Sequence, residues 1–439
     1  MTDQSFEAFQ QPPVEESAKA AQRIPLPPQS PFNRALLLLV AFRITRSIAA
    51  GMMIVALPYL VLHTLHDTSL TLGILYVVGV LSTALLAVAA GQLADRWSQK
   101  GALIITGFMV PASALIVYGN QSLPMLMVAA VMGGFAATGS LIGGGIGGAG
   151  QPVQSAIIAR ISTPDNRTRY YSVLDFLNGI AGAGGALLVP CFSVQNTFLV
   201  AGLISLAGAA ATLVITLPAA PPTPTVTRRQ SQQAIRHFSI TGALNGLSQG
   251  LITPFLIPFF VMVYHTPKAS MAVYTAIGSI LGAVALLTAP ALERRLGFVR
   301  SVTFTRAMGT LLLLIMAFWH NLEVGLIIYL LTPALRIAAL PAQQTALISR
   351  VEGNSMGRAL AANQVTRLSA ASGAMLCTGY LFDISAIESP FILYAGVMAV
   401  NIYLYYRFFG RHGFKAAQPD AIPIEETAAD AQEENGTAV

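Results

Sequence analysis

Two arginines lie inside an apolar run near the start of the chain, where charged side chains are otherwise absent. The run reads VAFRITRSIAAG from residue 40 and contains Arg43 and Arg46. An arginine near the centre of a bilayer costs about 2.5 to 3.5 kcal/mol on insertion scales, so it is by default a functional candidate. A guanidinium can bind a carboxylate or a phosphate in a bidentate manner. The alternative for Arg46, and for the equally deep Arg336 of a later run, is that they donate to backbone carbonyls exposed beside Gly51 and Pro333 and stabilise the fold.

Three further arginines, Arg306, Arg336 and Arg367, lie in other apolar runs. Arg306 sits near enough to the end of its run that it can snorkel to the surface. Arg46 and Arg336 lie too deep for this and need another partner. The candidate substrate-binding residues are therefore Arg43, Arg46 and Arg336.

Asp175 is the only acidic residue deep in these runs. It lies nearly as deep as Arg43, which is roughly 12 Å from its helix end at 1.5 Å per residue. An ion pair between Arg43 and Asp175 is therefore predicted, and a buried pair of this kind is often structural. If the protein moves protons, Asp175 is the candidate carrier. Asp383 and Glu388, near the outer face, are the alternatives.

The composition indicates a membrane protein. The chain has 439 residues, of which 54% are hydrophobic and 10% are charged, whereas soluble domains carry about 25% charged residues. Apolar runs of about 18 residues or more recur along it, without the alternation of a transmembrane barrel. We expect an all-α membrane protein with twelve transmembrane helices. The expected spans are residues 35–62, 69–93, 102–119, 123–150, 170–190, 196–217, 239–264, 271–291, 302–319, 324–349, 359–382 and 389–409.

Charge placement predicts the orientation, because Lys and Arg in short loops are retained in the cytoplasm. With the N-terminus inside, the cytoplasmic segments hold most of the 25 Lys and Arg residues, and the opposite loops hold only Lys268. Both termini are therefore expected in the cytoplasm, in the plasma (inner) membrane of a bacterium. The net charge of +6 reflects this topology and does not indicate nucleic-acid binding.

A proline-rich segment divides the chain into two similar halves. Four prolines lie between residues 218 and 236, and such segments act as semi-rigid spacers. PYLVLH in the first half is similar to PFFVMV in the second, and QSAIIARI is similar to QTALISRV. A parallel repeat of six helices is typical of transporters. The expected organisation is a disordered tail at 1–32, two pseudo-symmetric six-helix bundles at 33–217 and 237–410, a linker at 218–236 and an acidic tail at 411–439.

The most specific motif is GQLADRWSQKGAL, residues 91–103, between the second and third expected spans. It resembles the loop motif of the major facilitator superfamily, Gly-x-Leu-Ala-Asp-Arg-x-Gly-Arg-Lys, with Ser98 and Gln99 as departures. The resemblance implies a conformational latch, in which Asp95 lies near the positive N-terminal end of the eleventh span. The expected latch residues are Gly91, Asp95, Arg96, Lys100 and Arg358. The resemblance also implies that the first, fourth, seventh and tenth spans line a central cavity, so Arg46 and Arg336 are expected to approach it from opposite sides.

Three function classes follow. The resemblance to drug-efflux members of the superfamily implies a secondary active transporter that exports a small organic solute in exchange for protons, by alternating access. The excess of intramembrane positive charge favours instead a transporter of organic anions or phosphate esters. An enzyme or receptor is the weakest reading, because the spans hold no cluster of His, Cys or paired carboxylates. We expect no catalytic residue, metal or cofactor, and the expected partners of the monomer are substrate, lipids and protons.

Overall fold

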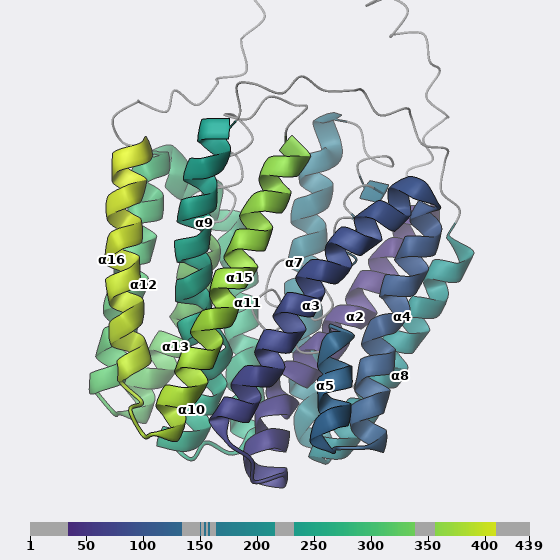
Figure 1. Cartoon of the computed structure of the whole chain (residues 1–439), viewed down its shortest axis with the longest axis horizontal. Coiled ribbons are helices and arrows are strands. Elements are labelled where there is room, and N and C mark those ends of the chain that lie inside the picture. The colour runs from purple at the N-terminus through teal and green to yellow at the C-terminus, as the bar shows by residue number, and fades with distance from the viewer. Residues whose placement is uncertain are drawn as a thin grey trace, which may run out of the picture.

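The protein is a bundle of long helices (Figure 1). The computed structural model describes residues 34–133, 150, 153–154, 157–158, 164–215, 232–338 and 356–409. Within these ranges all regular elements are helical, and they form the twelve expected spans. Nine of the described helices are long and apolar enough to cross a membrane. The all-α prediction is therefore confirmed.

Six spans form the first half of the bundle. They are α2 (Arg34–Tyr59) with the π-helical η1 (Leu60–Thr64), α3 (Ser69–Arg96), α4 (Gln99–Gly119), α5 (Leu123–Val131), α7 (Pro164–Leu188) with η4 (Val189–Cys191), and α8 (Val194–Val214). The later part of the fourth expected span lies outside the described residues.

Six spans form the second half. They are α9 (Gln232–Ile252) with η5 (Thr253–Phe255) and α10 (Leu256–Val263), α11 (Lys268–Leu296), α12 (Phe298–Phe318), α13 (Leu322–Ala338), α15 (Met356–Asp383) and α16 (Ser389–Phe409). Because α9 begins at Gln232, the last residues of the expected linker are helical. The end of the tenth expected span lies outside the described residues.

Short polar turns start several of these helices. The hydroxyl groups of Thr68, Ser98 and Ser193 each accept a hydrogen bond from the backbone N–H three residues later. Serine and threonine are favoured at this N-cap position, because the first N–H groups of a helix have no partner within it. These turns fix where α3, α4 and α8 begin.

Both halves use the same close crossing of two helices. A Cβ atom added at Gly51 of α2 would lie 2.0 Å from the carbonyl oxygen of Gly182 in α7. In the second half, a Cβ atom at Gly250 of α9 would lie 2.2 Å from the carbonyl oxygen of Ala371 in α15. Small residues of this kind let membrane helices pack backbone to backbone. The internal repeat is therefore visible in the packing.

The repeat extends to the turns after the first helix of each half. Pro58 lies inside α2 and Pro258 inside α10. The turns that follow contain His66 with a φ of 52° and His265 with a φ of 50°, a conformation that residues other than glycine rarely adopt. The same backbone course is therefore used twice.

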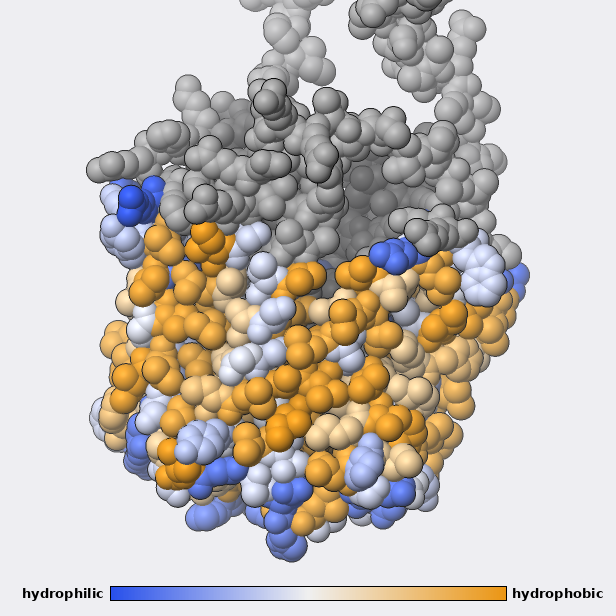
Figure 2. Space-filling model, viewed as in Figure 1, coloured by the Kyte–Doolittle hydropathy of each residue, from blue (hydrophilic) through white to orange (hydrophobic). Residues whose placement is uncertain are grey.

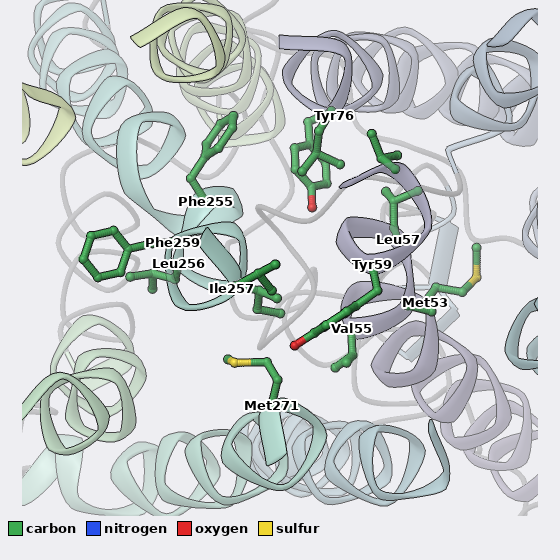
Figure 3. Close-up of a cluster of buried hydrophobic side chains, with 14 of the residues drawn as sticks. Met53, Val55, Leu57, Tyr59, Tyr76, Phe255, Leu256, Ile257, Phe259 and Met271 are labelled. Atoms are coloured by element: carbon green, nitrogen blue, oxygen red, sulfur yellow. The ribbon is translucent and has the colours of Figure 1, made fainter. Parts of the chain in front are cut away.

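The halves meet through two pairs of helices, in which α3 packs against α15 and α7 against α11. In Figure 1, α3 and α15 cross near the bottom of the bundle and diverge toward the top. We call the bottom end, where α2 ends and α3 begins, the closed end. Apolar side chains of both halves pack together there. Figure 3 shows Tyr59 and Tyr76 of the first half pointing toward Ile257 and Met271 of the second.

The flank of the bundle is apolar. Figure 2 shows apolar side chains over most of the visible flank and polar side chains at the closed end. Leu85, Leu311 and Ile327 are more than half exposed, a condition that lipid tails satisfy and water does not. The chain is an integral multi-pass membrane protein.

Candidate functional site

The first half contains the predicted ion pair. Nη2 of Arg43 in α2 donates to Oδ1 of Asp175 in α7 at 3.1 Å, with the two side chains 8% and 30% exposed. One turn further along, the hydroxyl of Ser47 donates to Oδ1 of Asn178 at 3.1 Å. The pair is confirmed, and both contacts join the same two helices of one half.

Arg46 lies in the same region of α2. It is 4% exposed, so it is buried as expected from its depth in the run. It is not among the residues that line the cavity of the second half described next. Arg46 does not line the second cavity described below either, so its approach to a central cavity stays a prediction.

A cavity of about 30 Å³, lined by both polar and apolar side chains, lies inside the second half. Four helices form it: α9, α12, α13 and α16. Arg306 and Arg336 both face it. Its lining residues are Asn245, Gln249, Thr305, Arg306, Gly309, Leu313, Thr332, Leu335, Arg336, Tyr394 and Met398. We call it the arginine cavity.

Arg306 does not reach the surface, so the snorkelling expectation is wrong. It is 7% exposed, and its Nη1 donates to Oδ1 of Asn401 in α16 at 2.8 Å. Its Cζ atom lies 4.6 Å from the ring centroid of Tyr405, which is a cation–π distance. Asn401 and Tyr405 therefore turn the guanidinium inward.

Arg336 is half-buried, and its Nη1 donates to the hydroxyl of Thr253 in η5. This partner is a side chain and not the backbone carbonyl that was the alternative from sequence. Among the described residues, no carboxylate forms an ion pair with Arg306 or Arg336, since the described ion pairs are Arg43–Asp175 and His320–Glu388. Both cations of the arginine cavity are held by neutral groups.

Two amides complete the arginine cavity. Asn245 and Gln249 lie one turn apart on α9 and are 8% and 7% exposed. Within the described part of the chain their side chains make no hydrogen bond. Buried amides usually have partners, so these two can bind a ligand or water in the cavity.

A second, smaller cavity of about 20 Å³ lies between the halves. It is lined by α2, α7 and α11, including Ser47, Asn178, Thr275 and Ser279. Nδ2 of Asn178 is buried and has no hydrogen-bond partner among the described residues. No charged residue from the described part of the chain lines this second cavity, in contrast to the arginine cavity.

Hydrogen bonds between the halves seal the closed end. Asp383, at the end of α15, accepts from the backbone N–H groups of Ser69 at 2.7 Å and Leu70 at 3.0 Å, at the start of α3. The hydroxyl of Tyr59 donates to the carbonyl oxygen of Thr266 at 2.7 Å. From the sequence, Asp383 was only an alternative proton carrier. Its hydrogen-bond partners are 314 and 313 positions away along the chain, so this contact could not be recognised from local sequence.

The residues of the expected latch lie at the other end of the bundle. Gly91 is in α3, and a Cβ atom added there would meet nothing within 4 Å. Lys100 is half-buried at the start of α4. The side chains of Asp95, Arg96 and Arg358 lie outside the described ones, so the latch stays a prediction.

No group of three or more His, Cys, Asp or Glu residues in the described ranges could hold a metal ion.

Comparison with known proteins identifies the fold. A family model described as the Major Facilitator Superfamily matches residues 39–375. The nucleoside transporter NupG superposes with a TM-score of 0.69 at 11% identity, over 85% of this chain and 99% of that chain. The human organic anion transporter MFSD10 gives 0.60 at 13% identity, over 86% and 100%.

A D-xylose–proton symporter gives a TM-score of 0.62 at 14% identity, over 85% of this chain and 96% of that chain. No curated protein sequence matches the chain significantly. At these identities the structural likeness shows the fold alone, so the solute has to be argued from the residues of this chain.

Proposed function

The chain belongs to the major facilitator superfamily and is a secondary transporter of small solutes, not an enzyme, and we propose that its solute is a small organic anion. One observation carries this proposal. Away from the helix ends, the apolar spans contain five arginines and a single carboxylate, and that carboxylate, Asp175, is paired with Arg43. An anionic solute would balance the positive charge of Arg306 and Arg336, which form no ion pair among the described residues.

Desolvation of the arginines favours an anionic solute. Moving an ion out of water costs several kcal/mol even after relaxation, and a partner of opposite charge offsets this cost. Guanidinium groups suit carboxylates and phosphates better than ammonium groups do, because their donors form a rigid planar fork. Arg46 and Arg336, the deepest candidates from sequence, supply such forks from the two halves.

Alternating access supplies the transport step. In this family a solute site between two bundles is exposed to one side at a time as the bundles rock. The contacts across the closed end support a form that is shut at that end. If the predicted topology holds, the closed end is the outer one.

Efflux driven by protons is the second candidate function, and the Arg43–Asp175 pair favours it. Asp175 is 30% exposed, so water can bring a proton to its carboxylate. Protonation would break the ion pair with Arg43 and couple proton movement to a change between α2 and α7. Asp175→Asn should then abolish accumulation against a gradient and leave downhill exchange.

Transport by the purified chain in proteoliposomes tests the main proposal. Uptake of a panel of labelled organic anions is compared for the wild type, Arg46→Gln, Arg336→Gln and Arg300→Gln. Arg300 is exposed at the start of α12. Its substitution also removes one positive charge, but outside the cavities, so it is the matched control. We expect Arg46→Gln and Arg336→Gln to lose anion uptake and Arg300→Gln to keep it. Normal anion uptake by all three variants would contradict the proposal.

A further inference from the structure

We propose that the arginine cavity is the subsite for the head group of the solute, and that this head group is a dianionic oxyanion such as a phosphate ester. The inference rests on the proposed function and adds a residue to it. Arg306, which the sequence alone assigns to the surface, is one of the two side chains that hold the head group.

The two guanidinium groups are positioned before any ligand binds. Asn401 and the ring of Tyr405 hold Arg306 from α16. Thr253 holds Arg336 from η5. Each bond uses one N–H group out of the five that a guanidinium carries, so each arginine keeps donors for a ligand in the cavity.

The chemistry of the lining fits an oxyanion. The charged groups of the cavity are both positive, and the neutral groups include the amides of Asn245 and Gln249 and the hydroxyls of Thr305 and Thr332. The amides can donate to the oxygens that the arginines do not bind, whereas the hydroxyls of Thr305 and Thr332 already donate to backbone carbonyls of their own helices. Two positive charges match the charge of a phosphate monoester, which is close to −2 near neutral pH.

The cavity is too small for a whole solute. A cavity needs about 10 to 15 Å³ to hold one water, so 30 Å³ holds about two waters, and side chains of the lining would have to move outward to admit a phosphate group. Complete ligand sites measure about 300 to 1,000 Å³. The rest of the solute would therefore lie outside the arginine cavity, toward the space between the halves.

The variant Asn245→Asp is expected to raise the melting temperature, whereas a substitution that only disturbs the fold would lower it. Asn245→Asp places a carboxylate in the cavity with almost no change of shape. If the cavity binds anions, this internal carboxylate should pair with the arginines, raise the melting temperature and abolish stabilisation by added phosphate. If Arg306 and Arg336 are already satisfied by their own partners, the new buried carboxylate should lower the melting temperature.

The experiment measures the melting temperature of the full chain in detergent against phosphate compounds, because a ligand of the folded state raises its stability. The probes are inorganic phosphate, glycerol phosphate and the lipid phosphatidic acid, with sodium chloride at equal ionic strength as the control. We expect stabilisation of the wild type and of Arg300→Gln. In Arg306→Gln and Arg336→Gln the apparent Kd should rise at least about tenfold.

The choice of probe distinguishes the source of the phosphate. Stabilisation by the soluble probes assigns the cavity to a soluble phosphate ester, and stabilisation by phosphatidic acid alone assigns it to a lipid head group. The inference is overturned if no probe stabilises the wild type, or if phosphate stabilises Arg306→Gln or Asn245→Asp as strongly as the wild type. If Arg306→Gln does not fold, the loss or retention of phosphate stabilisation in Asn245→Asp tests the inference instead.

Transport separates this inference from the proposed function. If the wild type transports organic anions and both Arg306→Gln and Asn245→Asp keep the same KM, the head-group subsite is wrong and the proposed function stands. If the wild type transports no organic anion, the proposed function itself fails.

Discussion

Removal of the charge of Asp383 should open the closed end. The carboxylate accepts two backbone hydrogen bonds, at 2.7 Å and 3.0 Å, from the first residues of α3. The acceptor belongs to one half and the donors to the other, so both bonds must break when the halves separate at this end. Asp383→Asn keeps the shape of the side chain but removes its charge and one acceptor oxygen.

The size of the effect follows from the contacts. Hydrogen bonds to charged groups contribute about 1.5 to 3 kcal/mol, and a carboxylate at a helix N-terminus adds about 0.3 to 1 kcal/mol. Because the Asp383 side chain is exposed, water weakens these contacts, and we take about 1 to 2 kcal/mol as the loss of stability of the closed form in Asp383→Asn. This is a factor of roughly 5 to 30 in the equilibrium between closed and open forms. An open population of about 1% should therefore rise to roughly 5 to 25%.

Distances between spin labels across the closed end measure this population. Leu123 and Leu322 start α5 and α13, in different halves, and are 44% and 41% exposed. Labels are attached after Leu123→Cys and Leu322→Cys, with the two exposed native cysteines, Cys191 and Cys377, replaced by serine. We expect the long-distance population to grow in Asp383→Asn.

Asp67→Asn is the matched control. Asp67 also caps the start of α3, but it accepts from the backbone N–H of Thr68 at 2.7 Å and the hydroxyl of Thr71 at 2.9 Å, both in its own half. Asp67→Asn should therefore leave the distances between the spin labels unchanged. Equal distance distributions for Asp383→Asn, Asp67→Asn and the unsubstituted chain would refute the reasoning.

Three further outcomes are expected. Arg43→Gln and Asp175→Asn should each lower the melting temperature, and the double variant should lose less than the sum of the two because the pair is already broken; full additivity would argue against the ion pair. Gly246→Ala should lower the melting temperature, because its Cβ atom would lie 1.9 Å from the carbonyl oxygen of Arg367. Gly373→Ala should not, because a Cβ atom there meets nothing within 4 Å. Asp95→Asn should slow transport in vesicles while membrane insertion stays normal, and unchanged transport would count against the latch.

The helices could be predicted because their cause is local. A run of apolar residues long enough to cross a bilayer must satisfy its backbone groups internally, and a helix does so. The last expected span, residues 389–409, has the same bounds in the structure as in the sequence analysis. The Arg43–Asp175 pair could be predicted from depth, because one carboxylate lay close in depth to that arginine.

The arginine cavity could not be predicted in the same way, because its cause is not local. The depth of Arg306 in its own run allowed snorkelling, but the direction of the side chain is set by Asn401, which is 95 positions away. A lone asparagine within the apolar run of α16 was the available signal. Arg336 was likewise expected to face Arg46, whereas the described cavity unites it with Arg306.

The central claim, that the solute is an organic anion, is tested most directly by counterflow in proteoliposomes with solutes matched in shape and different in charge. Each carboxylic acid or phosphate ester is compared with its neutral amide or alcohol and with a cationic amine of the same size. We predict that the anionic members exchange, that the neutral and cationic members do not, and that Arg336→Gln removes the exchange. Exchange of the neutral or cationic members, with the anionic ones excluded, would contradict the account.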